Sequence, residues 1–540
     1  MAAMENLVTD HLDLWTSAIK RKSAPGRGTS KKIELYGIKK LRELILQLAV
    51  MGKLIMQDTN DEPASELLKK IAAQKAKLVK EGKVKKEKPL PPIRDEEEPF
   101  NLPSGWSFQR LGEILTFEYG DNLPDSKRSG TGEFPVYGSN GVVGSHNISF
   151  VNGQCIVIGR KGSAGALNLC LEEGCCVTDV AYYCIPPADL SIQFIFKMLH
   201  THRLDSLGKG IKPGLNRNDA YGLIIAVPPL AEQHRIVAKV DELMALCDQV
   251  EQQTDASLRA HRMLVETLLY TLARATDHTQ VASAWQRIAE HFHTLFITEE
   301  SIDHLKQTIL QLAVMGKLVP QDANDEPASE LLKKIAAEKA KLAKEGRFKK
   351  EITLPPIKDE EEPFNLPSGW SFQRLGEILT FEYGDNLPDS KRSGTGEFPV
   401  YGSNGVVGSH NISSVNGPCI VIGRKGSAGA LNFCLEDGCC VTDVAYYCIP
   451  PADLSIKFVF KMLHTHRLDS LGKGIKPGLN RNDAYGLIIA IPPLAEQHRI
   501  VAKVGELMAL CDQLKSHINE VQTVQLYLAD ALTEKALAKA

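Results

Sequence analysis

The stretch Leu102-Pro-Ser-Gly-Trp106 decides the organisation of this chain, because it returns 264 residues later as Leu366-Pro-Ser-Gly-Trp370. The match continues, and residues 101–230 differ from residues 365–494 at only seven of 130 positions. A period of this length indicates a duplicated domain, because the repeats of solenoid proteins are only about 20 to 50 residues long. Whatever one copy binds, we expect the other copy to bind as well.

Length and composition are those of a globular protein with several cores. The chain has 540 residues, of which 43% are hydrophobic and 24% are charged, and a single core rarely extends beyond about 300 residues. No window approaches the roughly 18 apolar residues of a membrane helix, and the N-terminus has no secretory signal pattern, so we expect a cytoplasmic protein. The formal net charge is −3, which requires any nucleic-acid-binding surface to be local or shared with partners.

Composition shifts divide the chain into five segments. Residues 38–54 and 64–83 are rich in helix formers and lead to a proline-rich, acidic linker. The repeated block instead has short β-prone runs over 137–144, 155–159 and 176–184, with a helix expected over 190–202. We therefore expect an α+β protein with an N-terminal helical region (1–100), a first mixed α/β domain (101–230), a central helical spacer (231–364), a second mixed domain (365–494) and a C-terminal helix (495–540).

A long helix is expected after each repeated block. Apolar residues there alternate four and three apart, as in the a and d positions of a coiled coil. The seam positions are Ile236, Val240, Leu243, Cys247, Val250, Thr254, Ser257, His261, Leu264 and Leu268, then Ile500, Val504, Leu507, Cys511, Leu514, Ile518, Val521, Gln525, Leu528 and Leu532. Antiparallel pairing would relate the two domains by an approximate twofold axis, a symmetry that double-stranded DNA shares. The alternative is that both helices pack into one larger domain.

Three glycine-flanked segments of each block carry the candidate DNA contacts. The first contains an Asn-Gly pair, which suits base edges but is also a common tight turn. The second and third are cationic loops, for which a solvated surface is the alternative. The candidates in the first copy are Ser139, Asn140, Arg160, Lys161, Ser163, Lys209, Lys212, Asn216 and Arg217. Those in the second are Ser403, Asn404, Arg424, Lys425, Ser427, Lys473, Lys476, Asn480 and Arg481.

Signals for catalysis and metal binding are missing from the sequence. The 12 cysteines, six in each half, fit no C-x-x-C spacing, and we interpret them as small buried hydrophobic residues. His200 and His202 are interpreted as structural rather than metal-binding. The sequence contains no phosphate-binding G-x-x-x-x-G-K-[ST] loop, no Asn-Pro-Pro-Tyr segment and no obvious nuclease cluster. We therefore expect no catalytic residue, no metal and no cofactor in this chain.

Four sequence motifs occur in the same order in each half of the chain. They are Leu102 to Trp106 with Arg110-Leu-Gly-Glu113, Tyr137-Gly-Ser-Asn-Gly141, Ile158-Gly-Arg-Lys-Gly162, and Pro228-Pro-Leu-Ala-Glu-Gln-His-Arg-Ile-Val237 with its copy at 492–501. Together they resemble the specificity subunit of type I restriction-modification enzymes. The resemblance covers essentially the whole chain. It implies two target recognition domains separated by long helices, each reading one half of a split DNA site in the major groove.

The same resemblance implies partners and places the chemistry on them. Two modification (methyltransferase) subunits would dock on the helices and supply S-adenosylmethionine and the methyl-transfer site. Two restriction subunits would supply ATP-driven, Mg-dependent translocation and cleavage. The chain departs from the family pattern because its two recognition domains are almost identical, which predicts a self-complementary bipartite target with a nonspecific gap set by helix length.

Three other functions remain open from the sequence. A stand-alone DNA-binding regulator would share the recognition domains but would lack restriction partners. A self-contained methyltransferase or nuclease would need a cofactor loop or a metal cluster. A duplicated carbohydrate- or protein-binding scaffold would more typically carry aromatic rather than cationic loops.

Overall fold

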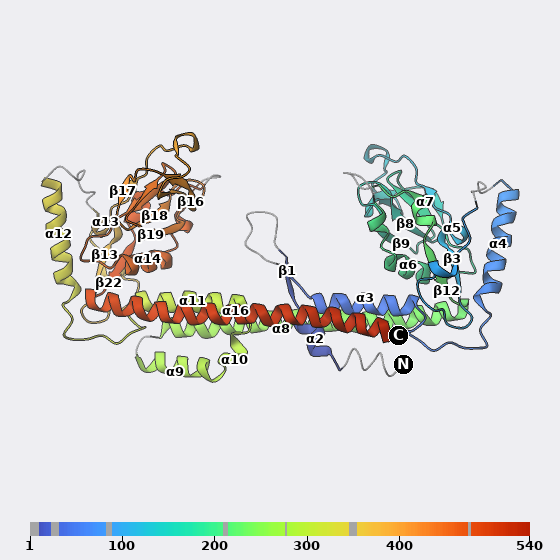
Figure 1. The fold of residues 1–540 in the computed structure, drawn as a ribbon, viewed down its shortest axis with the longest axis horizontal. Helices are drawn as coiled ribbons and strands as arrows, with labels where there is room; N and C mark the ends of the chain where they lie inside the picture. Colours follow the sequence, from blue (N-terminus) through green and yellow to red (C-terminus); the bar gives the residue numbers. More distant parts are fainter. Residues whose placement is uncertain are drawn as a thin grey trace. The chain divides into compact units, whose positions relative to one another are not determined.

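The computed structural model describes residues 10–22, 32–82, 89–208, 214–275, 278–344, 354–473 and 477–539. The chain forms two compact units, residues 1–257 with 521–540 (unit 1) and residues 258–520 (unit 2). Each unit contains one sheet-bearing domain and parts of both long helices, α8 (Leu230–Arg274) and α16 (Leu494–Lys539). The prediction of two mixed α/β domains with long helices is confirmed (Figure 1).

Unit 1 begins with helices and continues into the first sheet-bearing domain. Its helices are α2 (Leu12–Ser17), α3 (Tyr36–Val50), α4 (Ala64–Lys80), α5 (Leu111–Ile114), α6 (Ile192–Thr201) and α7 (Arg217–Tyr221), with 3-10 turns η1 (Asp95–Glu97), η2 (Asp125–Lys127) and η3 (Leu204–Leu207). Its strands are β1 (Lys20–Lys22), β2 (Lys32–Glu34), β3 (Ser107–Arg110), β4 (Glu118–Tyr119), β5 (Phe134–Gly138), β6 (Gly141–His146), β7 (Val151–Asn152), β8 (Cys155–Gly159), β9 (Leu167–Cys170), β10 (Gly174–Val177), β11 (Ala181–Cys184) and β12 (Ile224–Val227).

Unit 2 repeats this order in its sheet-bearing domain. Its helices are α9 (His278–Glu290), α10 (Phe292–Leu295), α11 (Glu299–Val314), α12 (Ala328–Lys344), α13 (Leu375–Ile378), α14 (Ile456–Thr465) and α15 (Arg481–Tyr485), with 3-10 turns η4 (Asp359–Glu361), η5 (Asp389–Lys391) and η6 (Leu468–Leu471). Its strands are β13 (Ser371–Arg374), β14 (Glu382–Tyr383), β15 (Phe398–Gly402), β16 (Gly405–His410), β17 (Val415–Asn416), β18 (Cys419–Gly423), β19 (Leu431–Cys434), β20 (Gly438–Val441), β21 (Ala445–Cys448) and β22 (Ile488–Ile491).

Two four-stranded sheets form each domain. In the first domain their orders are β6-β5-β10-β7 and β4-β11-β8-β9. Every residue of β8 and of β10 is buried, as expected for short apolar runs in the middle of a sheet. A third, two-stranded sheet pairs β3 with β12 in antiparallel register, so the chain enters and leaves the domain at the same place. The second domain repeats all three sheets.

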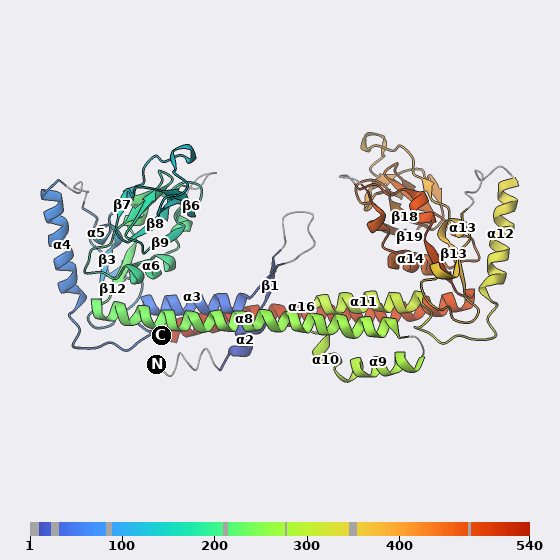
Figure 2. The ribbon, with the colours of Figure 1, turned by 180° about the vertical axis from the view of Figure 1, so that it is seen from behind.

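The start of each long helix packs on a short helix and on its own domain. In unit 2, one core cluster joins Ile500 and Val504 of α16 with Leu305 of α11 and Phe458 of α14. In unit 1, the Arg42 guanidinium of α3 lies 2.6 Å from Asp248 and 2.7 Å from Glu251 of α8. Figure 2 shows from behind how α3 follows the first half of α8.

Within unit 2 the two long helices run in opposite directions. Arg262 and Glu266 of α8 pair with Glu300 and His304 of α11, so α8 and α11 are parallel. Lys306 pairs with Asp512, whereas Asp303 pairs with Lys515, so α11 and α16 are antiparallel. The predicted antiparallel arrangement therefore holds for the parts of α8 and α16 that belong to this unit.

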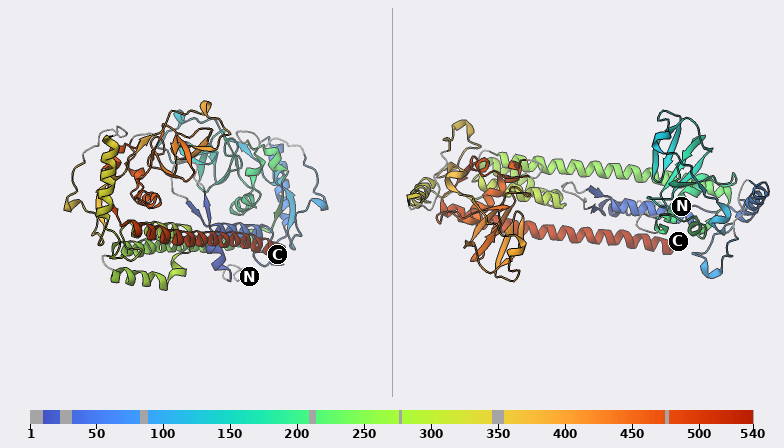
Figure 3. Two further views of the ribbon diagram at one scale, coloured as in Figure 1. Left: turned by 60° about the vertical axis from the view of Figure 1, so that its left-hand side comes forward. Right: turned by 90° about the horizontal axis from the view of Figure 1, so that it is seen from above.

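The end of α16 belongs to unit 1 and packs against α3. The Tyr36 hydroxyl donates to the Asp530 carboxylate at 2.8 Å, and Lys40 Nζ lies 3.1 Å from the same carboxylate. Seen from above in Figure 3, the blue α3 lies between the green α8 and the last turns of the red α16. A three-helix bundle of α3, α8 and the end of α16 thus supports the first domain.

The predicted seam is wrong at two positions in the second part of each long helix, whereas the predicted Leu268 does pack against the core. Leu264 and its counterpart Leu528 are each 51% exposed, whereas the neighbouring Val265 and Ala529 are 2% and 0% exposed. Ser257 and Val521 are exposed as well. An α-helix has about 3.6 residues per turn rather than 3.5, so a heptad pattern drifts by about 20° per heptad. The buried stripe therefore moves forward by one residue in both helices.

Among the described residues, no helix is long and apolar enough to cross a membrane.

Candidate nucleic-acid interface

The three candidate segments of the first domain come together at the end of β8. Gly159 ends this strand, and a Cβ there would lie 2.4 Å from the Ser139 carbonyl oxygen and 2.0 Å from that of Ser163. The Leu215 amide donates to the Arg160 carbonyl at 2.9 Å. We call this group of residues the loop cluster: Tyr119, Ser139, Asn140, Arg160, Lys161, Ser163, Asn216 and Arg217.

Two arginines of the loop cluster share one tyrosine ring. The Arg160 guanidinium carbon lies 5.1 Å from the Tyr119 ring centre, and that of Arg217 lies 5.4 Å from it. Arg160 is also 5.8 Å from the ring of Tyr182, which packs edge to face on Tyr119 at 5.1 Å. A cation over an aromatic face gains about 0.5 to 1 kcal/mol at exposed sites, and stacking pre-organises the planar guanidinium for two parallel hydrogen bonds.

Hydrogen bonds anchor this stack to the backbone. Arg217 Nη1 donates to the Phe117 carbonyl at 3.3 Å, and the Tyr182 hydroxyl donates to the Leu215 carbonyl at 3.2 Å. Burial raises the pKa of the Tyr182 hydroxyl, so it stays protonated and keeps its role as a donor. Tyr119 is 50% exposed, and Arg160 and Arg217 are half-buried, so the stack is partly accessible to a ligand.

The remaining candidates of the first copy have different settings. Asn140 is exposed at the tip of the two-residue turn between β5 and β6, so the Asn-Gly pair forms a tight turn that presents the Asn140 side chain to solvent. Lys161 Nζ lies 3.5 Å from Asp179, an acid that the sequence pattern of the loop did not reveal. Asn216 caps α7, and its side chain accepts from the Asn218 amide at 3.0 Å. Lys209 and Lys212 lie outside the described residues.

The loop cluster of the second domain has the same geometry. The Arg424 and Arg481 guanidinium carbons lie 4.8 Å and 5.0 Å from the Tyr383 ring centre. Lys425 lies 3.5 Å from Asp443, and Asn480 caps α15. Its members are Tyr383, Ser403, Asn404, Arg424, Lys425, Ser427, Asn480 and Arg481.

In the second domain the structure describes more of the third candidate segment than it does in the first domain. Lys473 Nζ lies 2.8 Å from the Asp483 carboxylate, with 79% of its side chain exposed. Lys476 lies outside the described residues. The Lys473 charge therefore stands at the rim of the loop cluster, beside the helix that Asn480 caps.

Sequence reasoning missed two candidates in each domain. Tyr119 was missed because the pairing of β4 with β11 brings it under Arg160, and no local pattern shows such a pairing. Arg203 has a φ of 45°, in the left-handed region that few residues other than glycine adopt, and its side chain is 77% exposed. The next residue, Leu204, lies against Gly165 of the second segment, so this strained arginine borders the loop cluster, as Arg467 does in the second domain.

The histidines and cysteines are largely placed as expected. His200 packs edge to face on Phe196 at 4.7 Å, and burial lowers the pKa of His200 and of His202. All 12 cysteines are free and buried, and burial raises the pKa of Cys170 to about 11. Thiols with raised pKa values are poor nucleophiles at neutral pH, which argues against a catalytic cysteine.

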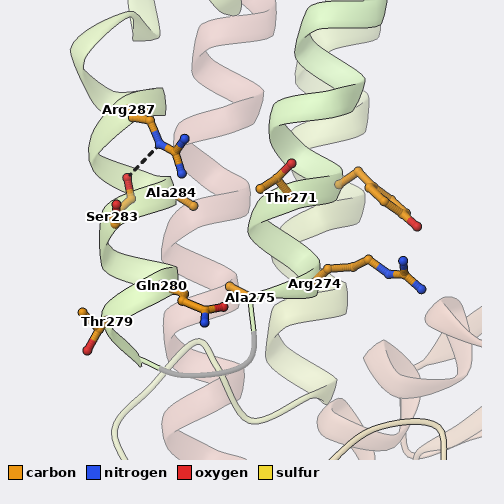
Figure 4. Close-up of a pocket in the computed structure, with 9 residues that line it drawn as sticks. Thr271, Arg274, Ala275, Thr279, Gln280, Ser283, Ala284 and Arg287 are labelled. Atoms are coloured by element: carbon orange, nitrogen blue, oxygen red, sulfur yellow. Dashed lines mark hydrogen bonds between the residues drawn. The ribbon is translucent and has the colours of Figure 1, made fainter.

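A pocket lies between α8 and α9, and none of its lining residues belongs to a loop cluster (Figure 4). Its volume is about 640 Å³. Arg274 lines it and stacks on Tyr270 at 5.0 Å, and Arg287 donates to the Ser283 carbonyl at 3.4 Å. Its nine lining residues, all of them described, include no acid, histidine or cysteine, so it holds no acid-base pair for catalysis.

Two near-identical domains, each with a partly exposed arginine-tyrosine stack in its loop cluster and each packed on long helices, define a protein with two equivalent recognition domains. Comparison with known proteins identifies the family to which the chain belongs. The family described as the type I restriction modification DNA specificity domain matches residues 103–260 and 367–522. The chain belongs to this family, and it is a non-catalytic subunit that provides DNA sequence specificity in a type I restriction-modification system.

Two relatives support this membership over the full length of the chain. The EcoAI specificity subunit of Escherichia coli is 40% identical over 593 residues, covering 99% of this chain and all of that protein. The EcoEI specificity subunit of the same organism is 37% identical, with the same coverage. A solved structure of the HsdS subunit from Thermoanaerobacter tengcongensis is 19% identical, with a TM-score of 0.39, and covers 81% of this chain and 98% of that one.

Proposed function

We propose that the two loop clusters read the two halves of a self-complementary DNA site. None of the seven differences between the repeated blocks falls on a member of either loop cluster. They fall at Phe150/Ser414, Gln154/Pro418, Leu169/Phe433, Glu173/Asp437, Gln193/Lys457, Ile195/Val459 and Val227/Ile491. Identical reading groups in matched geometry select the same bases, so each domain reads the same half-site.

Roles within each cluster follow from side-chain chemistry. Stacked arginines suit the O6 and N7 acceptors of guanine, and Asn140 and Asn404 suit adenine. Lys161, Ser163, Lys209, Lys212 and their copies suit phosphates, which position the domain without reading sequence. The recognition domains are residues 101–230 and 365–494, and the helices between and after them set the nonspecific gap.

Partners complete the enzyme. Two modification subunits dock on the helices and bring S-adenosylmethionine, and two restriction subunits bring ATP-driven, Mg-dependent cleavage. Exposed apolar residues at matching positions support docking on the helices: Met263 and Leu264 on α8, and Tyr527 and Leu528 on α16, are each at least 51% exposed. The cytoplasm, where DNA and these cofactors are found, is the proposed location.

A domain replacement tests the equivalence of the two readers. Residues 101–230 are replaced by the sequence of residues 365–494, which makes both domains identical, and the chain is expressed with its modification partner. We expect the methylated motif to be unchanged. A changed motif would mean that the seven differing residues contribute to specificity, and the equivalence would be lost.

The proposed partners have a direct test. Affinity purification of the full chain from its host should bring down a methyltransferase subunit. A chain that binds DNA specifically without such a partner would contradict the proposed docking and would match the stand-alone regulator that the sequence left open.

A further inference from the structure

Three buried thiols meet between the two four-stranded sheets of each recognition domain. Cys155 of β8 and Cys170 of β9 face each other across a strand pair, and Cys175 comes from β10 in the other sheet. The three sulfur atoms lie within 4.8 Å of one another, and Cys155 Sγ is 3.5 Å from Cys175 Sγ. The residues are 0%, 1% and 0% exposed. Cys419, Cys434 and Cys439 form the same cluster in the second domain.

We propose that each thiol cluster binds one thiophilic cation, with zinc as the expected ion. Zinc binds thiolates at about 2.3 Å, so two sulfurs of a tetrahedral site are about 3.8 Å apart. The three sulfur atoms could therefore reach an ion between them if their side chains moved by about 1 Å or less. The sulfurs come from three different strands, which fixes their positions before any ion arrives.

A carboxylate lies beside one of the three sulfurs in the second domain. Cys434 Sγ donates to Glu436 Oε2 at 3.2 Å, and Glu436 also accepts from the Leu435 amide at 3.2 Å. Glu172 is its counterpart in the first domain. Zinc accepts both thiolates and carboxylates as ligands. The clustered ligand atoms are the three sulfurs, so Glu436, which among them contacts only the Cys434 sulfur, would have to turn toward the ion to complete a four-ligand structural site.

The position of the cluster gives the ion a structural role. It lies in a small core of eight buried residues that joins the two sheets: Tyr137, Val151, Cys155, Val157, Cys170, Cys175, Val177 and Ala181. Small cores supply little stability, and a structural metal commonly compensates. β8 runs from Cys155 to Gly159 and leads directly to Arg160, and β5 contains Tyr137 and leads to the turn of Ser139. An ion here would hold the bases of two DNA-reading loops.

Metal content of the purified full-length chain tests the proposal. We expect two zinc ions per chain by mass spectrometry, one after Cys170→Ser and none after the combined C170S and C434S change. The matched control is C184S with C448S, which changes two buried cysteines outside the clusters; it should retain two ions.

A spectroscopic measurement on the unmodified chain covers the case in which a cysteine variant does not fold. The chain is purified without zinc and titrated with Co²⁺, and three thiolates per ion should give intense sulfur-to-cobalt charge-transfer bands that saturate at two equivalents. Absence of metal uptake by the wild-type chain would overturn the proposal. So would a Cys155–Cys175 disulfide in a non-reduced peptide map, or a bound ion whose X-ray absorption shows no sulfur neighbours.

Discussion

The indole of Trp106 donates from Nε1 to the buried carboxylate of Glu232 at 3.0 Å, and Trp370 does the same to Glu496 at 3.0 Å. Trp106 opens the first recognition domain, whereas Glu232 lies in the first turn of α8 and is 1% exposed. Gln57 donates to the other oxygen of Glu232 at 3.2 Å. This bond therefore fixes the entrance of each domain to the start of the helix that follows it.

Removing the indole donor should destabilise the attachment of each domain. We expect Trp106→Phe with Trp370→Phe to cost about 1 to 3 kcal/mol per site, because a buried carboxylate oxygen loses its partner. Urea unfolding followed by circular dichroism measures this loss. Trp285→Phe is the control, since Trp285 is 41% exposed on α9; equal effects of the two changes would contradict the assigned role.

The two stacked arginines should contribute equally to DNA binding. Arg160→Ala and Arg424→Ala are each expected to cost about 1 to 3 kcal/mol, and the two losses should agree within about 1 kcal/mol. Fluorescence anisotropy with the cognate duplex, in the complex with the modification partner, measures both. Lys69→Ala, an exposed change on α4, should leave affinity unaltered. A larger difference between the two arginine variants would show that the sites are not equivalent.

The shared tyrosine ring should matter more than its hydroxyl. Tyr119→Ala with Tyr383→Ala removes the ring on which two arginines stack in each domain, and we expect a loss of about 1 kcal/mol per domain. Tyr119→Phe with Tyr383→Phe keeps the ring and should bind nearly as well as wild type. The same anisotropy assay distinguishes them, and a phenylalanine variant as weak as the alanine variant would disprove the platform role.

The glycine that ends β8 should be intolerant of any side chain. A Cβ at Gly159 would lie 2.0 Å and 2.4 Å from two backbone oxygens, whereas one at Gly222 would meet its nearest atom at 3.6 Å. Gly159→Ala with Gly423→Ala should therefore displace the reading loops and weaken cognate binding at least tenfold, while Gly222→Ala with Gly486→Ala should not. Affinity of the glycine-to-alanine pair equal to that of the control would contradict the assembled loop cluster.

Acid should destabilise the recognition domains through two partly buried histidines. Burial lowers the pKa of His202 and of His466 from the ordinary value of 6.5. The unfolded chain then binds protons more readily than the folded chain. The stabilisation that these neutral histidines give the folded state is therefore complete above pH 6.5 and is lost as pH falls through their folded pKa. His202→Gln with His466→Gln should reduce the fall in melting temperature between pH 7.5 and about 5. His11→Gln, which changes an exposed histidine, should leave that fall unchanged.

Local signals predicted the elements well. β8 spans the predicted 155–159, because a short apolar run bounded by glycine is typical of a buried strand. α6 lies within the predicted 190–202, because Ser191 caps its start. The predicted run 176–184 instead forms β10 and β11, since a turn separates them. The loop segments were predicted from glycine and cation spacing, and the structure places the described ones together.

Long-range features could not be predicted in this way. Tyr119 reaches Arg160 only through strand pairing, and Lys161 meets Asp179 from another strand end. Cys170 and Cys175 are five residues apart but lie in different sheets, so their approach to Cys155 depends on how the sheets pack. The prediction of the helix seam was wrong at Leu264, because the small difference between a heptad repeat and the true helical period accumulates over many turns.

Methylome sequencing of cells that express this chain with its modification partner tests the central claim most directly. Two equivalent readers predict one methylated motif in which a short half-site, a gap of unspecified bases and the inverted half-site follow one another. An asymmetric motif with two unrelated half-sites would contradict that account.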